Sequence, residues 1–171
     1  FDQSDIERRL TEVGAVFDRC NETEFIDKAA RAMADNKAVG WFQGRMEFGP
    51  RALGARSILG NPSDPQTQRT LNLKVKFRES FRPFAPAVLR EDVSRWFDLD
   101  HDSPYMLIVA PVENEHCHPL FRLDLERRGL DRVNAQRSDI PAVTHVDFSA
   151  RVQTVHKDTN PRFHALISRF K

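Results

Sequence analysis

The spacing of hydrophobic and polar residues predicts several short helices along the chain. The first begins near Ser4 with a capping box, and the second begins near Thr23 and carries apolar residues at helical spacing. Asp64, which is followed by a proline, predicts the start of a third helix that runs to about Val75. Asn160, again followed by a proline, caps a final helix that runs to the end of the sequence.

Continuous or alternating apolar runs predict short strands between these helices. The predicted strands cover residues 38–42, 57–59, 84–89, 105–109, 143–148 and 151–155. Trp41 and Phe42 are expected in the core, and Pro86 places its strand at a sheet edge or a bulge. Residues 105–109 are the most apolar run and are expected to form the central strand. The mixed order, with too few regular βαβ units for a Rossmann sheet, predicts an α/β fold in one domain.

Residues 113–140 break this pattern because they are rich in arginine, acidic residues and histidine. They are predicted to form an exposed, mobile excursion between two strands, with a short helical piece near residues 123–128. His116, Cys117 and His118 fall in this stretch. No second pair of ligands at a suitable spacing accompanies them, so they do not predict a metal site.

Composition limits the classes of function. The 171 residues include 26 lysines and arginines against 25 aspartates and glutamates, which leaves a formal net charge of +1. This balance argues against a protein that coats nucleic acid with a broad basic face. Cys20 and Cys117 are far apart, so they are expected to be free thiols in a reducing, cytoplasmic setting. No apolar run approaches membrane-spanning length.

Although the whole chain is nearly neutral, residues 44–86 concentrate cationic side chains. The cations are Arg45, Arg51, Arg56, Lys74, Lys76, Arg78 and Arg82. The phenylalanines among them, which are expected to be buried, are Phe48, Phe77, Phe81 and Phe84. Cations held beside buried aromatic rings predict a firm pocket that suits phosphate or carboxylate. The alternative is that these cations cover the surface or pair with Glu47, Glu79 and Asp92.

The spacing of the basic residues indicates how they would share an anion. Lys76 and Arg78 are two residues apart, so on an extended segment their side chains would project to the same side. Lysine offers a mobile point charge, while arginine offers a planar fork that grips two oxygens. Together with Arg82 they suit a polyphosphate or an acyl phosphate. Arg51 lies in a glycine-containing turn that is expected to bring backbone N–H groups close to the same anion.

A second candidate group lies later in the sequence. His145 and Asp147 alternate on one face of the predicted strand 144–148, and Arg151 follows across a turn. The three side chains either face a ligand or make the ordinary hydrogen bonds of a strand surface. Arg151 is the strongest ligand-binding candidate of the three, and the pattern leaves both interpretations open.

Several long motifs resemble the C-terminal domain of the O-carbamoyltransferases, enzymes that decorate antibiotics and nodulation factors. The resemblance is carried first by GRMEFGPRALGARSI at residues 44–58 and by LNLKVKFRESFRPFAPAVL at residues 71–89. SPYMLIVAPV, PAVTHVDFSARVQTV and NPRFHALISRF then follow in the same order. The resemblance covers nearly the whole chain except the stretch at residues 113–140.

This resemblance implies a YrdC-like domain over residues 1–171, a twisted open sheet flanked by helices. It implies that the domain binds ATP, which brings Mg²⁺, and carbamoyl phosphate, and that it forms carbamoyl adenylate and releases pyrophosphate. Lys76 and Arg78 match the Lys-x-Arg pair that YrdC-type proteins place on phosphates, and they are implied to be catalytic. The other positions that are implied to line the ATP and carbamoyl phosphate site are Arg51, Arg82 and Arg151. No prosthetic group or metal site is implied in this domain.

The family also has parts that this sequence does not contain. An N-terminal domain of the actin-like ATPase class is expected as the partner that holds any iron or other metal and passes the carbamoyl group to a hydroxyl of the acceptor. The family continues past the position of Lys171 into a strand and an NTSFN-type motif that completes the nucleotide site. We therefore expect a fragment that binds ATP weakly and is inactive alone.

Two other functions remain open from the sequence. A non-catalytic docking domain would contact an N-terminal catalytic partner without binding a nucleotide. A YrdC-like RNA-binding module would contact tRNA, although the near-zero net charge counts against it. Titration with ATP separates the enzyme from the docking domain. The identity of the acceptor lies beyond what these residues determine.

Overall fold

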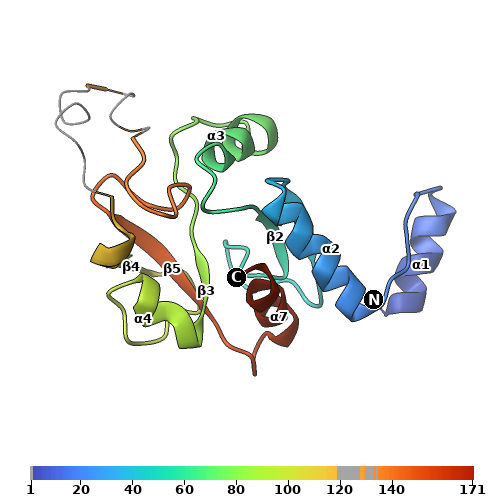
Figure 1. The fold of residues 1–171 in the computed structure, drawn as a ribbon. Coiled ribbons are helices and arrows are strands. Elements are labelled where there is room, and N and C mark those ends of the chain that lie inside the picture. The colour runs from blue at the N-terminus through green and yellow to red at the C-terminus, as the bar shows by residue number, and fades with distance from the viewer. Residues whose placement is uncertain (1, 119–127, 130–132, 134) are drawn as a thin grey trace.

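The computed structural model describes residues 2–118, 128–129, 133 and 135–171, and it confirms a mixed α/β fold (Figure 1). The helices are α1 (Gln3–Glu12), α2 (Glu22–Ala34), α3 (Thr67–Leu71), α4 (Val93–Trp96) and α7 (Pro161–Phe170). The shorter or wider turns are the π-helix η1 (Asn72–Lys76) and the 3-10 helices η2 (Arg90–Asp92) and η3 (Asn114–His116). The strands are β1 (Val39–Phe42), β2 (Arg56–Leu59), β3 (Ala87–Leu89), β4 (Ile108–Pro111) and β5 (Ser149–Val155).

The strands form two small sheets. β1 and β2 pair as an antiparallel hairpin, and the second sheet has the order β3-β5-β4, in which β5 is parallel to β3 and antiparallel to β4 (Figure 1). The prediction that residues 105–109 form the central strand is therefore wrong. β4 begins at Ile108 and lies at an edge, where Val109 remains 55% exposed. Pro86 does precede an edge strand, as predicted.

β5 occupies the centre because both of its faces are covered. Ala150 and Val152 point into one hydrophobic core, which is built with β3, β4 and α4. Val155 belongs to a second core, which α2, α7 and the β1–β2 hairpin supply around Trp41. Side chains alternate between the faces of a strand, so the same strand contributes to both cores. Residues near the start of β5 are thereby held on a rigid support.

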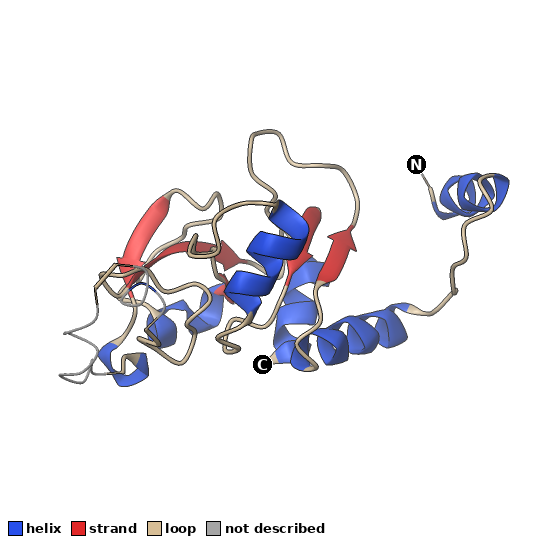
Figure 2. Cartoon of the chain, turned by 90° about the horizontal axis from the view of Figure 1, so that it is seen from above, coloured by secondary structure: helices blue, strands red, loops and turns tan. Residues whose placement is uncertain are grey.

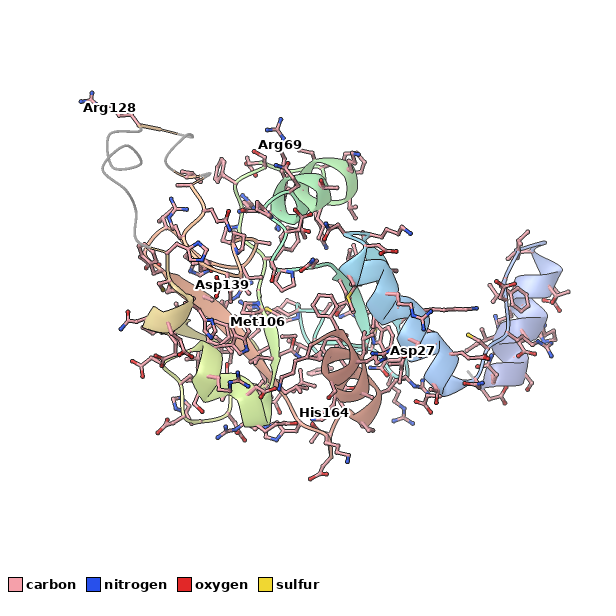
Figure 3. All side chains as sticks on the ribbon, viewed as in Figure 1. Asp27, Arg69, Met106, Arg128, Asp139 and His164 are labelled. Carbon is pink, nitrogen blue, oxygen red and sulfur yellow. The ribbon has the colours of Figure 1, made fainter. Side chains whose placement is uncertain are left out.

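Helices α2 and α7 pack against each other and share a hydrophobic core with the hairpin. Asn21 caps α2 in a capping box with Glu24, and Asn160 caps α7 with a proline at its first position. Arg169 of α7 donates a hydrogen bond to Asp27 of α2, which is labelled in Figure 3. The start of α7 is as predicted from the sequence. In the described part of the chain, no helix combines the length and apolar character that a bilayer span requires.

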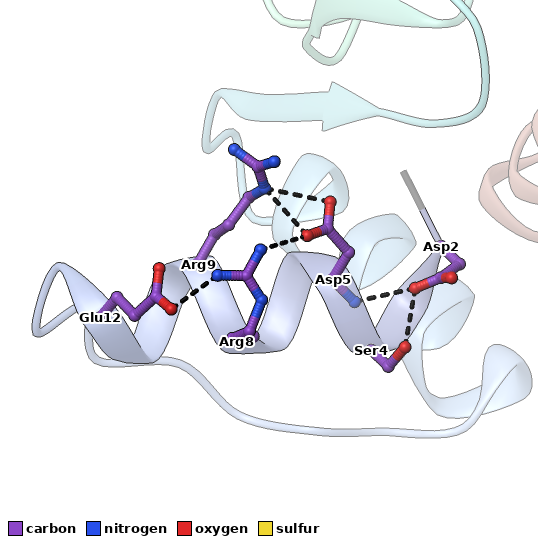
Figure 4. A network of polar contacts seen from close by, with 6 residues as sticks. All are labelled: Asp2, Ser4, Asp5, Arg8, Arg9 and Glu12. Atoms are coloured by element: carbon purple, nitrogen blue, oxygen red, sulfur yellow. Dashed lines mark hydrogen bonds and ion pairs between the residues drawn. The ribbon is translucent and has the colours of Figure 1, made fainter.

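Helix α1 stands apart from the other elements in two perpendicular views (Figures 1 and 2). Asp2 caps it by accepting a hydrogen bond from Asp5 N, whereas Ser4 donates to Asp2 (Figure 4). The capping box predicted at Ser4 is therefore wrong, because an acceptor that lies closer to the helix start takes that role. Along the helix, Arg8 bridges Asp5 and Glu12.

Two predicted elements differ in the later part of the chain. Residues 143–148 form turns instead of a strand, and Phe148 has a positive φ of 64°. In the described part of residues 113–140, Ser138 is fully buried and pairs with Cys117 in a β-bridge. The expected exposed excursion is wrong for much of residues 135–140, because Ala135, Arg137, Ser138 and Ile140 are buried and Ile140 belongs to the core that includes β5. The predicted helical piece at 123–128 lies largely outside the described residues.

Candidate functional site

The loop between β1 and β2 carries Arg51 and is fastened at its base by a carboxylate. Glu47 accepts hydrogen bonds from Leu53 N at 2.6 Å, Ala55 N at 2.8 Å and Arg56 Nε at 3.0 Å. Burial opposes the ionisation of Glu47, but the backbone N–H groups of Leu53 and Ala55 outweigh it and lower the pKa of this carboxyl. A charged, half-buried carboxylate thus closes the turn in which Arg51 lies.

The same loop is also held against β5 and α7. Gln153 of β5 donates to Leu53 O at 2.8 Å, and Gln43 donates to Gly54 O at 2.7 Å. Gly54 has a φ of +106°, and a Cβ at this position would lie 2.5 Å from a ring carbon of Phe163 in α7. Only glycine fits here, because both the backbone conformation and the close approach exclude a side chain.

This support places Arg51 near Arg151, which lies on the β5 face that also carries Gln153. Burial lowers the pKa of Arg151, and the nearby charge of Arg51 lowers it further. Within the described part of the chain, no carboxylate and no hydrogen-bond acceptor partners either guanidinium. Two like charges held together on a rigid frame form a natural site for an anion. We call Arg51 and Arg151 the cation pair.

His145 lies beside the cation pair in a tight turn that leads into β5. The turn is closed by a hydrogen bond from His145 N to Ser149 O at 2.7 Å. Burial lowers the pKa of His145 and the charge of Arg151 lowers it further, although Asp147 opposes the shift. His145 and Asp147 thus lie in a turn and not on one face of a strand, and that they face a ligand together with Arg151 stays a prediction.

The basic segment, defined here as residues 76–82, follows the π-helix η1. Lys76 ends η1, and Phe77 adopts a left-handed conformation with φ 49° and ψ 50°. The expectation that Lys76 and Arg78 share one face of an extended strand is therefore wrong. The Arg78 guanidinium turns back and donates from Nε to Asn72 Oδ1 at 2.6 Å, and it lies 5.0 Å from the centre of the Phe84 ring.

Asn72 organises this segment from the interior. It is fully buried, and its Nδ2 donates to Ser80 O at 3.1 Å and to Arg82 O at 2.8 Å. Arg82 itself forms an exposed ion pair with Glu79, at 3.0 Å. Lys76 is exposed, and no partner of its ammonium group is found among the described residues. That Lys76, Arg78 and Arg82 contact one anion stays a prediction.

Backbone pairing brings the end of the basic segment towards β5. Phe84 N donates to Ala142 O at 3.1 Å, just before the His145 turn, and Gln153 N donates to Pro86 O at 2.9 Å. Because β3 and β5 run parallel, the segments that enter them meet at the same end of the sheet. The residues that follow Arg82 therefore lie beside the part of β5 that carries Arg151.

The aromatic side chains depart most from expectation. Phe48 and Phe77 are exposed, Phe77 by 86%, and Phe81 is also exposed, whereas Phe84 is half-buried. Trp41 is buried as predicted, but its neighbour Phe42 is 76% exposed because the hairpin is covered on one face only. The positions of Arg51 and Arg151 are thus fixed by hydrogen-bonded loops and by β5, and not by packing against buried aromatic rings.

A separate hollow of about 590 Å³ lies between α2, α7 and the end of β1. Gln43, Arg45, Asn160 and Arg162 contribute polar groups to its wall. Arg162 Nε donates a hydrogen bond to Glu22 Oε1 at 2.8 Å. None of the predicted site residues lines this hollow, so it is distinct from the cation pair.

The histidines near the start of the polar stretch are held by one carboxylate. His116 Nδ1 and His118 Nε2 lie 3.0 and 2.6 Å from the oxygens of Asp139, which Figure 3 labels. These contacts lower the pKa of Asp139. The Cys117 thiol instead donates to Val112 O at 3.6 Å. Burial raises the pKa of this thiol. The described residues contain no cluster of three or more His, Cys, Asp or Glu side chains that could hold a metal.

Comparison with known proteins identifies the family. The sequence profile described as carbamoyltransferase C-terminus matches residues 30–171. The chain belongs to this carbamoyltransferase family. The resemblance that the motifs predicted is confirmed, and the cation pair and the basic segment both lie within the matched range.

The relatives include named carbamoyltransferases. The 3'-hydroxymethylcephem-O-carbamoyltransferase of Amycolatopsis lactamdurans is 42% identical over 144 residues, which cover 84% of this chain and 23% of that enzyme. Nodulation protein NolO of Bradyrhizobium diazoefficiens is 40% identical over 151 residues, 86% of this chain and 24% of that protein. An uncharacterized Synechocystis protein is 53% identical over 159 residues, 93% of this chain and 26% of that protein. The chain spans about a quarter of the length of these curated relatives.

Several residues that build the candidate site are not indicated by the sequence pattern. Asn72, Gln153 and Ser149 are buried polar side chains that hold the loops, and the pattern indicates Glu47 only as a counter-charge. The sequence could have indicated Gln153, because it is a polar residue at an inward-facing position of a strand. A buried polar side chain at such a position needs a hydrogen-bond partner. Asn72 gives no such signal, since the π-helix that it begins was not predicted.

Proposed function

We propose that this chain is the part of an O-carbamoyltransferase that binds ATP and carbamoyl phosphate and forms carbamoyl adenylate. The observation that carries the proposal is the cation pair. Arg51 and Arg151 are half-buried, close to each other and without a carboxylate partner among the described residues. A bound phosphate would relieve the repulsion between them and accept their charge-assisted hydrogen bonds.

The chemistry balances if each substrate loses one leaving group. Water takes the phosphoryl group from carbamoyl phosphate and leaves carbamate and inorganic phosphate. A carbamate oxygen then attacks the α-phosphorus of ATP, and pyrophosphate departs with its bond electrons. Cations that neutralise the leaving pyrophosphate stabilise such a transition state. In this proposal, the basic segment (Lys76, Arg78 and Arg82) supplies these charges, the cation pair binds the phosphate of carbamoyl phosphate, and Mg²⁺ arrives with ATP.

Transfer to the acceptor hydroxyl is assigned to the part of the protein outside this chain. The chain is about 40% identical to both a nodulation protein and a cephem carbamoyltransferase. Similarity to proteins with such different names supports a role in the step that precedes acceptor recognition. The expected partner for that step is an N-terminal domain of the actin-like ATPase class, and any further metal would belong to that domain.

A chimera tests this function directly. Residues 30–171 would replace the matching segment of the Amycolatopsis cephem carbamoyltransferase, and carbamoyl-phosphate-dependent exchange of labelled pyrophosphate into ATP would be measured. We expect exchange in the chimera and its loss when Arg51 and Arg151 are both changed to methionine. Exchange that persists in a folded double variant would refute the role of the cation pair. Binding of partner protein without any nucleotide binding would favour the docking-domain alternative.

A further inference from the structure

The hydrogen bonds around His145 have a defined direction. Ser149 Oγ lies 2.7 Å from Asp147 Oδ1 and 3.0 Å from His145 Nδ1, and Ser149 N also donates to Asp147 at 3.1 Å. The serine hydroxyl has one proton, and an ionised carboxylate is the stronger acceptor. These hydrogen bonds from Ser149 lower the pKa of Asp147, so the carboxyl is ionised at neutral pH. Ser149 therefore donates to Asp147.

This direction determines the tautomer of His145. Because the only proton of Ser149 Oγ is directed to Asp147, the oxygen is free to accept a hydrogen bond from Nδ1–H of the imidazole. Burial and the adjacent Arg151 lower the pKa of the ring, so it is neutral at neutral pH. A neutral ring with a proton on Nδ1 has a bare lone pair on Nε2. Within the described residues, no donor is found for that atom.

The site thus places two cations, which attract an anion, close to a neutral nitrogen, which accepts a hydrogen bond. The cation pair attracts an anion, whereas the lone pair on Nε2 of His145 can accept a hydrogen bond from an N–H or O–H donor. Ser149, which lies 3.0 Å from His145 Nδ1, and Arg151 are two residues apart on β5 and share one face of the strand, so both requirements apply to one small region. Carbamoyl phosphate meets both, because its amino group is attached to the same carbonyl carbon as its phosphate. Acetyl phosphate carries a methyl group at that position and meets only the first.

We propose that His145 Nε2 accepts a hydrogen bond from the carbamoyl amino group and so selects carbamoyl phosphate over other acyl phosphates. Ser149 and Asp147 are positioning residues that hold the ring in the accepting tautomer. This inference rests on the proposed function of the cation pair. The adenine amino group of ATP is separated from the phosphates by the ribose, so it does not satisfy both requirements at one place.

Binding measurements separate selection from anion binding. The chain would be titrated at neutral pH with carbamoyl phosphate, acetyl phosphate and inorganic phosphate. His145→Asn keeps an amide N–H near the position of Nδ1 but removes the acceptor at Nε2, whereas His145→Gln can present an oxygen there. We expect His145→Asn to weaken carbamoyl phosphate binding alone, by about three- to tenfold, as for one neutral hydrogen bond. His145→Gln and the control His101→Asn, at an exposed histidine paired with Asp100, should keep the preference.

The tautomer provides an independent readout. Long-range proton–nitrogen spectra of the imidazole should show the proton of His145 on Nδ1, and Ser149→Ala should shift it towards Nε2. A wild-type ring protonated on Nε2 would overturn the proposal, and so would an equal loss for all three anions in His145→Asn. A wild-type chain that does not prefer carbamoyl phosphate to acetyl phosphate would also overturn the proposal. Failure of the proposed function is distinct, because anion affinity would then survive Arg151→Met.

Discussion

The cation pair and the basic segment carry similar charges, but the chain holds them in different ways. Arg51 and Arg151 are half-buried and are supported by Glu47 and Gln153, with no counter-charge among the described residues. The basic segment is largely exposed, and Arg82 already has a partner in Glu79. Exposed charges are screened by water and salt, while partly buried charges are screened much less. The density of cations in the sequence therefore does not indicate where an anion is bound most strongly.

The two regions also differ in the number of contacts that hold them in place. The loop of Arg51 is tied to β1, β5 and α7, so its position is defined by the core. The basic segment is held by the buried side chain of Asn72 and by Gln68, which donates to Phe81 O at 2.7 Å. A flexible lysine at the end of such a segment suits a group that moves onto a phosphate as it reacts. We infer that the cation pair binds the ground state and that Lys76 acts mainly in the transition state.

The largest expected effect comes from Lys76→Ala in the exchange assay with the chimera. Loss of a charge-assisted contact made in the transition state should cost about 2–4 kcal/mol, which slows exchange by roughly two orders of magnitude or more. Lys74→Ala is the matched control, because Lys74 is an exposed lysine in the same π-helix. Near-normal exchange by folded Lys76→Ala would remove the basic segment from the reaction.

Arg151→Met should mainly affect the affinity for anions. The loss of hydrogen bonds to a charged ligand corresponds to about 1.5–3 kcal/mol, or one to two orders of magnitude in the dissociation constant of inorganic phosphate. The free energy of unfolding without ligand should not fall, because burial and Arg51 already disfavour this charge. Calorimetry and denaturant unfolding measure the two quantities, with the exposed Arg95→Met as control. A destabilised variant that retains full affinity would contradict this assignment.

Asn72→Ala tests the support of the basic segment. The variant leaves the buried carbonyl groups of Ser80 and Arg82 and the Arg78 guanidinium without this partner, which should lower the free energy of unfolding by about 1–3 kcal/mol. Asn114→Ala, at an exposed position, should have little effect. Urea denaturation is a suitable measurement. An unchanged midpoint would mean that the segment does not depend on Asn72.

Phe77→Gly should stabilise the chain by up to about 1 kcal/mol. Phe77 has a left-handed conformation that costs an L-residue energy, and its ring is 86% exposed, so little packing is lost. Phe48→Gly is the control, because Phe48 is also exposed but is not among the residues with positive φ. Thermal unfolding compares the two variants. Equal losses of stability in both would show that the backbone at Phe77 is not strained.

The smallest expected effect is in the pH dependence of stability. The pKa of His145 is lowered from its ordinary value of 6.5, first by burial and then by Arg151. The unfolded chain therefore binds more protons than the folded chain below about pH 6.5, and stability should decline as the pH falls through this value. The lowered pKa of Asp147 acts only below its ordinary 3.8, so a decline that begins near pH 6.5 does not come from Asp147. The His145→Asn variant should not lose stability as the pH falls through about 6.5. If urea denaturation gives the same dependence of the free energy of unfolding on pH for the variant and the wild-type chain, the assignment is contradicted.

Local signals predicted most of what depends on a few neighbouring residues. The proline after Asn160 indicated the start of α7, and the apolar spacing near Thr23 indicated α2 to within a residue or two. The long motifs by themselves indicated the carbamoyltransferase family, because they consist of unusual residues in a fixed order. The strand predicted at 143–148 failed, because an alternating pattern cannot distinguish a strand from the turn that precedes one.

The sequence by itself determined the family and the mixed α/β class, because these depend on residue identity and local spacing. Only the tertiary structure decided which cations lie together. Arg51 and Arg151 are a hundred residues apart in the sequence and meet because β5 is buried on both faces and holds the Arg51 loop through Gln153. The orientation of His145 likewise depends on where Ser149 and Asp147 place their hydrogen bonds. Such positions are set by long-range packing, which periodicity along the chain does not encode.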